Sequence, residues 1–273
     1  MPTQAEKSAA FRALHERDGA FIIPNPWDVG TARLLAHLGF EALATTSAGY
    51  AFSLGRRDNS VSRDEMMEHA RALVEATDLP VSADLENGFG DDPGTVAETF
   101  RLATATGLAG ASIEDSTGRP EEPIYEFGLA VERVRAAVEA ARALPFPFLV
   151  TGRAENFLVG RPDLADTIRR LQAYQEAGAG VLYAPGLTRR EDIVSVVRSV
   201  DRPVNVVMGL QGVQLSLAEL SEIGVKRISV GSALSRAALG AFLRAAREMR
   251  ERGTFTFAEE AVSYRDLRAM FGV

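Results

Sequence analysis

The sequence lacks cysteine and has few histidines and lysines, and each shortage excludes or disfavours a kind of chemistry. Without cysteine, disulfide bonds, thiolate metal ligands and thiol nucleophiles are all excluded. The three histidines, His15, His37 and His69, fall inside helical patterns, which argues against a Ser-His-Asp triad or a histidine-rich zinc site. Of the two lysines, Lys7 and Lys226, the second precedes a predicted strand, which argues against a Schiff-base lysine at a strand's carboxyl end. Carboxylates, arginines and hydroxyls remain.

The chain also lacks a hydrophobic run long enough to span a membrane. Its polar, helical beginning does not resemble a signal peptide. The formal net charge is −7 at pH 7 and no basic stripe appears, so neither nucleic acid nor an anionic membrane is an expected partner. With 46% hydrophobic residues in a chain of 273, we expect a soluble, globular, cytoplasmic protein.

The stretch that organises the chain is VSADLENGFG at 81–90. Its hydrophobic residues alternate with polar ones, which is typical of a strand, and a glycine-rich turn follows. The alternation places Ser82, Asp84 and Glu86 on one face. Two carboxylates at the end of a buried strand are costly unless something positive neutralises them. A hard divalent cation such as Mg²⁺, which prefers oxygen ligands, would do so.

Two similar strand ends follow along the chain. The segment ASIED at 111–115 brings Glu114 and Asp115, and LVTGRAEN at 149–156 brings Arg153 and Glu155. Each group of charges comes directly after a hydrophobic run. We therefore interpret the rest of the chain as the frame that brings these ends together.

Eight predicted strands alternate with helices, and no linker separates them. Strict alternation indicates a parallel sheet. At this length, eight units predict a single (β/α)8 barrel of the TIM type, formed by residues 1–273 as one domain. An extra helix is expected near 4–17 and a helical tail at 254–273. A doubly wound open sheet is the alternative, but no G-x-G-x-x-G motif follows the first strand.

In such a barrel the functional groups lie at the carboxyl ends of the strands. The candidates there are Ser47, Asp84, Glu86, Glu114, Arg153 and Asn205. Alternation also places Thr45 with Ser47 on the inward face. Two interpretations stay open for single residues: Arg153 could pair with Glu155 in a structural ion bridge, and Asn205 could contact either a ligand or a structural partner.

With these residues in place, the chain resembles the isocitrate lyase/phosphoenolpyruvate mutase superfamily over nearly its whole length. The most specific segments are DLENGFG at 84–90, IED at 113–115, GRAE at 152–155, PVNV at 203–206 and RISVG at 227–231. Their order and spacing together carry the resemblance, which extends from NPWD at 25–28 to SVGSAL at 229–234.

The resemblance implies a barrel that binds Mg²⁺ or Mn²⁺ together with a 2-oxo acid or its enolate. Asp84 would be the direct metal ligand, and Glu86 and Glu114 would hold waters on the metal, in keeping with the tendency of Mg²⁺ to retain water. Glu86 stands where aspartate is usual in the family but keeps the charge. Members also tend to form tetramers that exchange a C-terminal helix, so the tail of this chain could be swapped between subunits of a homotetramer or dimer.

The resemblance also implies a substrate site. The segment 47–49 matches the one that receives the substrate carboxylate, Arg153 matches an arginine that contacts substrate, and Asp58 matches an acid near the reacting end. The predicted substrate-binding residues are Thr45, Ser47, Ala48, Gly49, Arg153 and Asn205.

The loop at 116–128 departs from both branches of the superfamily. It lacks the Lys-Arg-Cys-Gly-His type of signature found in the lyase branch, and also the Lys and Asn usual in the phosphonate branch. Tyr125 or Glu121 is our candidate for the proton carrier in this loop, with a solvated lid as the alternative. The predicted catalytic residues are thus Arg153, Asp58, Tyr125 and Glu121.

These features predict a Mg²⁺-dependent lyase or decarboxylase that cleaves a C–C bond in a small 2-oxo or 2-hydroxy (di)carboxylate through a stabilised enolate. One alternative is a P–C bond enzyme, of the phosphoenolpyruvate mutase or phosphonopyruvate hydrolase kind, in which Arg119 replaces the missing lysine. The other is a barrel that retains the metal site without catalysis.

Overall fold

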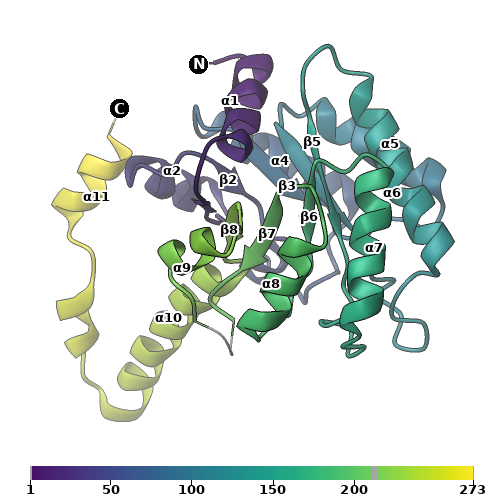
Figure 1. Ribbon diagram of the computed structural model, residues 1–273. Helices are drawn as coiled ribbons and strands as arrows, with labels where there is room; N and C mark the ends of the chain where they lie inside the picture. The colour runs from purple at the N-terminus through teal and green to yellow at the C-terminus, as the bar shows by residue number, and fades with distance from the viewer. Residues whose placement is uncertain (1, 211–213, 273) are drawn as a thin grey trace.

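The computed structural model describes residues 2–210 and 214–272 and contains one parallel sheet of eight strands, in the order β1-β8-β7-β6-β5-β4-β3-β2 (Figure 1). The strands are β1 (Phe21–Ile23), β2 (Leu43–Ala44), β3 (Val81–Asp84), β4 (Gly110–Glu114), β5 (Leu149–Arg153), β6 (Val181–Tyr183), β7 (Val204–Val207) and β8 (Arg227–Ser229). Helices separate successive strands, as the right-handed crossovers of parallel strands require.

The sheet curls until its first two strands meet. The backbone N–H of Ala44 donates to Pro24 O at 3.1 Å, and Asn25 Nδ2 donates to Thr45 O at 2.9 Å. Asn25 Oδ1 also accepts from the N–H groups of Val230 and Gly231, both at 2.9 Å. One asparagine therefore ties the carboxyl ends of β1, β2 and β8 together, and the predicted (β/α)8 barrel is confirmed.

The helices surround the barrel and extend beyond it. They are α1 (Gln4–Glu16), α2 (Val29–His37), α3 (Ser47–Ser53), α4 (Arg63–Glu75), α5 (Pro93–Thr104), α6 (Phe127–Arg142), α7 (Leu164–Glu176), α8 (Arg190–Arg198), α9 (Leu217–Glu222), α10 (Ala233–Arg252), the 3₁₀ helix η1 (Thr256–Glu260) and α11 (Tyr264–Phe271). In the described ranges, none of them combines the length and the hydropathy that crossing a membrane would take.

Polar side chains cap the first turn of several helices. Ser62 and Ser216 form capping boxes, and Asp92 caps α5 with Pro93 at its first position. Helix α8 begins after Arg189, which makes no capping hydrogen bond with its side chain.

Two strand ends differ from the prediction because local hydrogen bonding redirects the chain. The second strand ends at Ala44, before the predicted inward-facing pair of Thr45 and Ser47, and Ser47 begins α3 because Thr46 Oγ1 accepts from the N–H of Gly49 at 3.2 Å. The third strand ends at Asp84. Glu86 does not continue the alternation but adopts a left-handed conformation with φ of 50°.

Both lysines tie chain segments together. Lys7 Nζ, on α1, donates to Thr77 O at 2.7 Å, and Lys226 Nζ, at the amino end of β8, donates to Gly19 O at 2.8 Å and to Arg17 O. Helix α1 thereby packs over the amino ends of the strands, where Phe11 is fully buried. Neither lysine lies at the carboxyl end of a strand.

A buried polar link stabilises the carboxyl ends of β4 and β5. Asp115 Oδ1 accepts from the N–H of Glu155 at 2.8 Å, while its Oδ2 accepts from Arg170 Nη1 at 3.1 Å and from the hydroxyl of Tyr174. Arg170 also pairs with Asp166 at 2.7 Å. Helix α7 therefore holds two neighbouring strand ends in place through one carboxylate.

After β8 the chain leaves the barrel as an arm formed by α10, η1 and α11, which Figure 1 shows projecting away from the other helices before α11 returns beside α2. Large hydrophobic side chains of this arm are exposed, with Phe242 at 67%, Phe255 at 66% and Tyr264 at 88%. Such a concentration of exposed hydrophobic residues is unusual on a monomer surface.

We expect Arg170→Met to lower the free energy of unfolding by about 3–5 kcal/mol, because it leaves the buried Asp115 carboxylate without its cation. Arg169→Met is the matched control. Arg169 pairs with the same Asp166 but its side chain is 61% exposed, so its loss should cost less than about 1 kcal/mol. Urea unfolding of both variants measures the difference, and equal losses would contradict a stabilising role for the link.

Candidate active site

Arg153 lies at the centre of a cluster of carboxylates at the carboxyl ends of β3, β4 and β5. Its Nη1 pairs with Asp84 Oδ1 at 2.8 Å, its Nη2 with Glu114 Oε2 at 3.0 Å and its Nε with Glu155 Oε1 at 2.9 Å. The pairing of Glu114 with Arg153 follows directly from the register of the sheet, in which the two are neighbours on β4 and β5. All three nitrogens of the guanidinium are thus engaged.

The cluster contains more carboxyl groups than cations. Burial works against the charge of Arg153, but Glu155, Glu114 and Asp84 together raise its pKa well above the ordinary value. Burial likewise raises the pKa of Glu114 well above its usual range, against the attraction of Arg153, and raises that of Glu155 to about 7. The cluster therefore favours protonated carboxyl groups, or a further cation, around the fixed guanidinium.

The second carboxylate oxygen of Asp84 faces the start of α3. It accepts from Ser47 Oγ at 2.9 Å and from the Ser47 N–H at 3.2 Å, while the Asp84 N–H donates to Thr45 Oγ1 at 2.9 Å. Ser47 Oγ also lies 3.4 Å from Asp58 Oδ1. Burial and the neighbouring Asp84 raise the pKa of Asp58.

Glu86 is buried beside this cluster with its Oε1 lacking any hydrogen-bond partner. Burial, followed by the charges of Asp84 and Asp58, raises its pKa to about 8. A buried carboxylate oxygen without a donor is costly, and its left-handed backbone adds strain. A cation at this position would satisfy the oxygen.

Beneath the cluster, the barrel interior holds a second polar layer. Asn205 Nδ2 donates to Ser229 Oγ at 3.0 Å, and Arg227 Nε donates to Asn205 Oδ1 at 2.8 Å. Arg227 Nη2 reaches Thr151 Oγ1 at 3.0 Å, whereas its Nη1 has no partner. Asn205 therefore has structural partners, and it also lines an interior cavity of about 90 Å³ that Asp84 and Arg153 line from above.

A larger hollow of about 430 Å³ opens above the cluster and brings half of the predicted site residues together. Those lining it are Ser47, Ala48, Asp58, Asp84, Glu114 and Arg153. The sequence reasoning missed Tyr183, whose ring lies 5.1 Å from the Arg153 guanidinium carbon and faces both cavities. Its place at the carboxyl end of β6 was the available signal.

Thr45 and Asn205 line the interior cavity instead, and Glu86, Gly49, Tyr125 and Glu121 line neither of the two. Gly49 is buried, and its N–H is already bonded to Thr46. Tyr125 and Glu121 line a separate hollow of about 330 Å³, where the Tyr125 hydroxyl donates to Asp91 Oδ1 at 2.6 Å. Burial and Asp91 raise the pKa of Tyr125 to about 12. A proton-carrying role for either loop residue requires the loop to move and stays a prediction.

The carboxylates around Arg153 are the candidate ligands for a divalent metal. Across residues 2–210 and 214–272, no three acidic or histidine side chains converge as a ready metal site, because Arg153 lies between Asp84 and Glu114. The chemistry nevertheless fits a hard cation. The groups are carboxylate oxygens in excess over the one guanidinium, and Glu86 Oε1 is an orphaned buried acceptor.

Comparisons with known proteins identify the family and agree with the fold. The family model described as phosphoenolpyruvate phosphomutase matches residues 11–250. The crystal structure of a Burkholderia cenocepacia J2315 protein, provisionally named a lyase or mutase, superposes on this chain with a TM-score of 0.97. The two sequences are 66% identical, and the match covers 99% of this chain and 97% of that one.

Two curated relatives are each 33% identical. An uncharacterized protein of Mycobacterium tuberculosis aligns over 87% of this chain and 88% of its own length. The 2-methylisocitrate lyase of Escherichia coli aligns over 66% of this chain and 62% of its own length. With the family model matching most of the barrel, the chain belongs to the phosphoenolpyruvate phosphomutase family, within the isocitrate lyase/phosphoenolpyruvate mutase superfamily.

Proposed function

We propose that this protein is a divalent-metal-dependent lyase or decarboxylase that cleaves a C–C bond in a small 2-oxo or 2-hydroxy dicarboxylate. The observation that carries the proposal is the cluster in which Arg153 joins Asp84 and Glu114 at the floor of one open hollow. Membership of a superfamily that includes a C–C lyase among its curated relatives supports it.

Breaking a bond next to a ketone leaves an enolate, whose oxygen carries developing negative charge. Asp84, Glu86 and Glu114 would hold the metal, Mg²⁺ or Mn²⁺, which as a Lewis acid stabilises that charge. Arg153 presents a fixed cation beside the same position, and a preorganised donor of this kind is typically worth about 3–4 kcal/mol of barrier. Tyr183 packs over the guanidinium and restricts its movement.

The substrate carboxylate would lie along the wall formed by Ser47 and Ala48. Asp58 stands on the same wall, 3.4 Å from Ser47 Oγ, with its pKa raised by burial and by Asp84. A carboxyl group whose pKa is moved toward neutrality can both give and take a proton. We therefore assign Asp58 to proton transfer at the reacting end.

A P–C bond enzyme is the weaker candidate. It would need Arg119 to take the place of a loop lysine, but Arg119 pairs with Asp91 at 2.9 Å and lines the hollow of Tyr125, not that of Arg153. Cleavage of a C–C bond makes less demand on the loop, because the enolate is stabilised by groups at the strand ends.

The first test is calorimetric titration with oxalate, which resembles the enolate of pyruvate, in the presence and absence of Mg²⁺. We expect wild type to bind oxalate only with Mg²⁺, and Asp84→Ala to lose that binding by at least about a hundredfold, since a metal contact is removed. Glu139→Ala, which removes an exposed carboxylate of α6, is the control and should bind as wild type does.

Turnover distinguishes the remaining possibilities. Release of a 2-oxo acid or CO₂ from oxo- or hydroxy-dicarboxylates, lost in Asp84→Ala, supports the proposal. Phosphate released from phosphonopyruvate would favour P–C chemistry, and tight oxalate binding without any turnover would favour a binding protein. Unchanged turnover in Asp84→Ala would refute the metal-dependent mechanism.

A second test uses the raised pKa of Glu86. In metal-free protein the pKa of the Glu86 carboxyl is about 8, against 4.5 for the ordinary group. Between these two pH values the folded chain therefore keeps a proton that the unfolded chain has lost. Stability should therefore fall as the pH rises through the interval between those two values. Glu86→Gln should flatten this fall, and Glu139→Gln should not.

Thermal melts in EDTA across that interval measure the slope. Added Mg²⁺ at the upper end of the interval should raise the melting temperature of wild type more than that of Glu86→Gln, because the cation replaces the missing proton. Identical slopes in wild type and Glu86→Gln would show that Glu86 titrates normally.

We also propose that the arm of α10, η1 and α11 mediates a homo-oligomer, a tetramer or a dimer, by packing against a second copy. Its exposed Phe242 and Phe255 support this. Phe242→Glu should shift the mass measured by light scattering toward the monomer, whereas Glu248→Gln, a polar change on the same helix, should not. A wild-type monomer at all concentrations would refute the assembly.

A further inference from the structure

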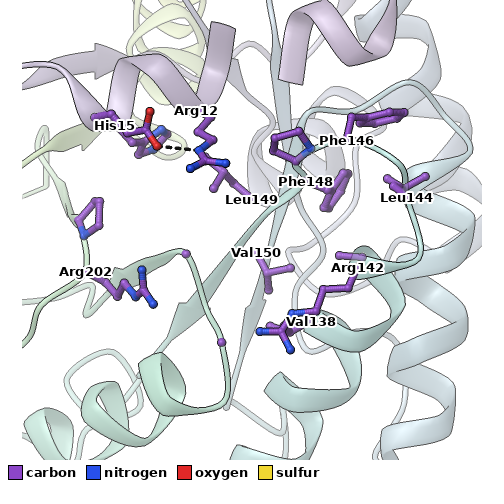
Figure 2. A pocket seen from close by; sticks show the side chains of 16 residues that line it. Arg12, His15, Val138, Arg142, Leu144, Phe146, Phe148, Leu149, Val150 and Arg202 are labelled. Carbon is purple, nitrogen blue, oxygen red and sulfur yellow. Dashed lines mark hydrogen bonds and ion pairs between the residues drawn. The ribbon is translucent and has the colours of Figure 1, made fainter. Parts of the chain in front are cut away.

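A further hollow, of about 450 Å³, lies at the opposite end of the barrel from Arg153, and we call it the basal hollow. It is formed by α1, the end of α6, the beginning of β5 and the segments that lead into β6 and β7 (Figure 2). Its volume falls within the range usual for small-molecule sites. It shares no lining residue with the hollow above Arg153.

The basal hollow is positively charged in a chain whose formal net charge is −7. Figure 2 shows Arg12, Arg142 and Arg202 around it, contributed by three separate segments. Arg12 pairs with Glu16 at 2.6 Å. In the part of the chain that the structure describes, Arg142 and Arg202 have no acidic partner within ion-pair distance.

His15 does not add to this charge. Burial, followed by the nearby charge of Arg227, lowers its pKa to about 3, so the ring is neutral at physiological pH. Its Nδ1 is 2.8 Å from Phe11 O, which fixes the ring on α1. Two guanidinium groups therefore remain free to receive an anion, and guanidinium groups pair with carboxylate or phosphate in bidentate fashion.

The remaining wall is apolar. Phe146, Phe148 and Leu149 line it (Figure 2), and these side chains are only partly buried. Gly178 stands at the edge with φ of +103°, and a Cβ there would come within 2.7 Å of Arg142 Nη2. The glycine lets the Arg142 guanidinium lie against the backbone at the rim of the hollow.

From this combination we infer that the basal hollow is a binding site for an amphipathic organic anion, separate from the active site. The carboxylate or phosphate head lies between Arg142 and Arg202, and the aryl or acyl body lies against Phe146 and Phe148. Charge alone would suit a bare ion, and an apolar wall alone would suit a neutral molecule. The two together select a ligand that carries both.

Phenyl phosphate is the probe, measured by calorimetry on the full chain against inorganic phosphate and benzoate. We expect one phenyl phosphate per chain, bound at least about tenfold more tightly than inorganic phosphate, because the ring adds apolar contact. Benzoate distinguishes a carboxylate ligand from a phosphate ligand. An affinity for benzoate close to that for phenyl phosphate assigns the site to carboxylates as well, and a much lower affinity assigns it to phosphates.

The variants localise the site. The double variant Arg142→Gln/Arg202→Gln should weaken the binding of phenyl phosphate at least about tenfold. The matched double variant Arg190→Gln/Arg198→Gln, on α8 outside the hollow, should leave the binding unchanged. Phe148→Ser should reduce the affinity for phenyl phosphate to the affinity for inorganic phosphate. These arginines are exposed, so the double variants should fold, as thermal melts would verify. No binding to wild type, or equal weakening in both double variants, would overturn the proposal.

Discussion

The pairing of one buried arginine with three carboxylates governs how the carboxyl end of this barrel is built. Arg153 would be costly to bury alone, and so would each of Asp84, Glu114 and Glu155. Because the acids come from three adjacent strand ends, the charges meet only when β3, β4 and β5 are in register. Folding of the sheet and assembly of the site are therefore the same event.

The sequence predicted the architecture because the signals are local and repeated. Alternation of eight hydrophobic runs with amphipathic segments indicates a parallel sheet. Eight such units in a chain of this length predict that the sheet closes into a barrel. The charged residues at the strand ends were also visible, since the carboxyl ends of parallel strands meet on one side. Asp84, Glu114 and Arg153 were thus predicted to lie together, and they line one hollow.

What the sequence could not predict depends on contacts between distant segments or on backbone conformation. The left-handed conformation of Glu86 ends the alternation of inward and outward side chains, and no pattern of residues predicted it. Tyr125 was assigned to the site from its loop alone, but Asp91 and Arg133 hold it in another hollow, with the Arg133 guanidinium 3.9 Å from its ring centre. Asp91 is distant from Tyr125 in the sequence, so this contact emerges only in three dimensions.

The two lysines carry a further consequence for the protein's chemical reactivity. Lys7 and Lys226 both direct Nζ at backbone carbonyls, and burial lowers the pKa of Lys7. Basic surface groups are otherwise arginines, which do not react with acyl donors or aldehydes as amines do. Acetylation and amine-directed cross-linking would therefore find few lysine amines on this surface, and modification of either lysine would first have to break a contact that ties one segment of the chain to another.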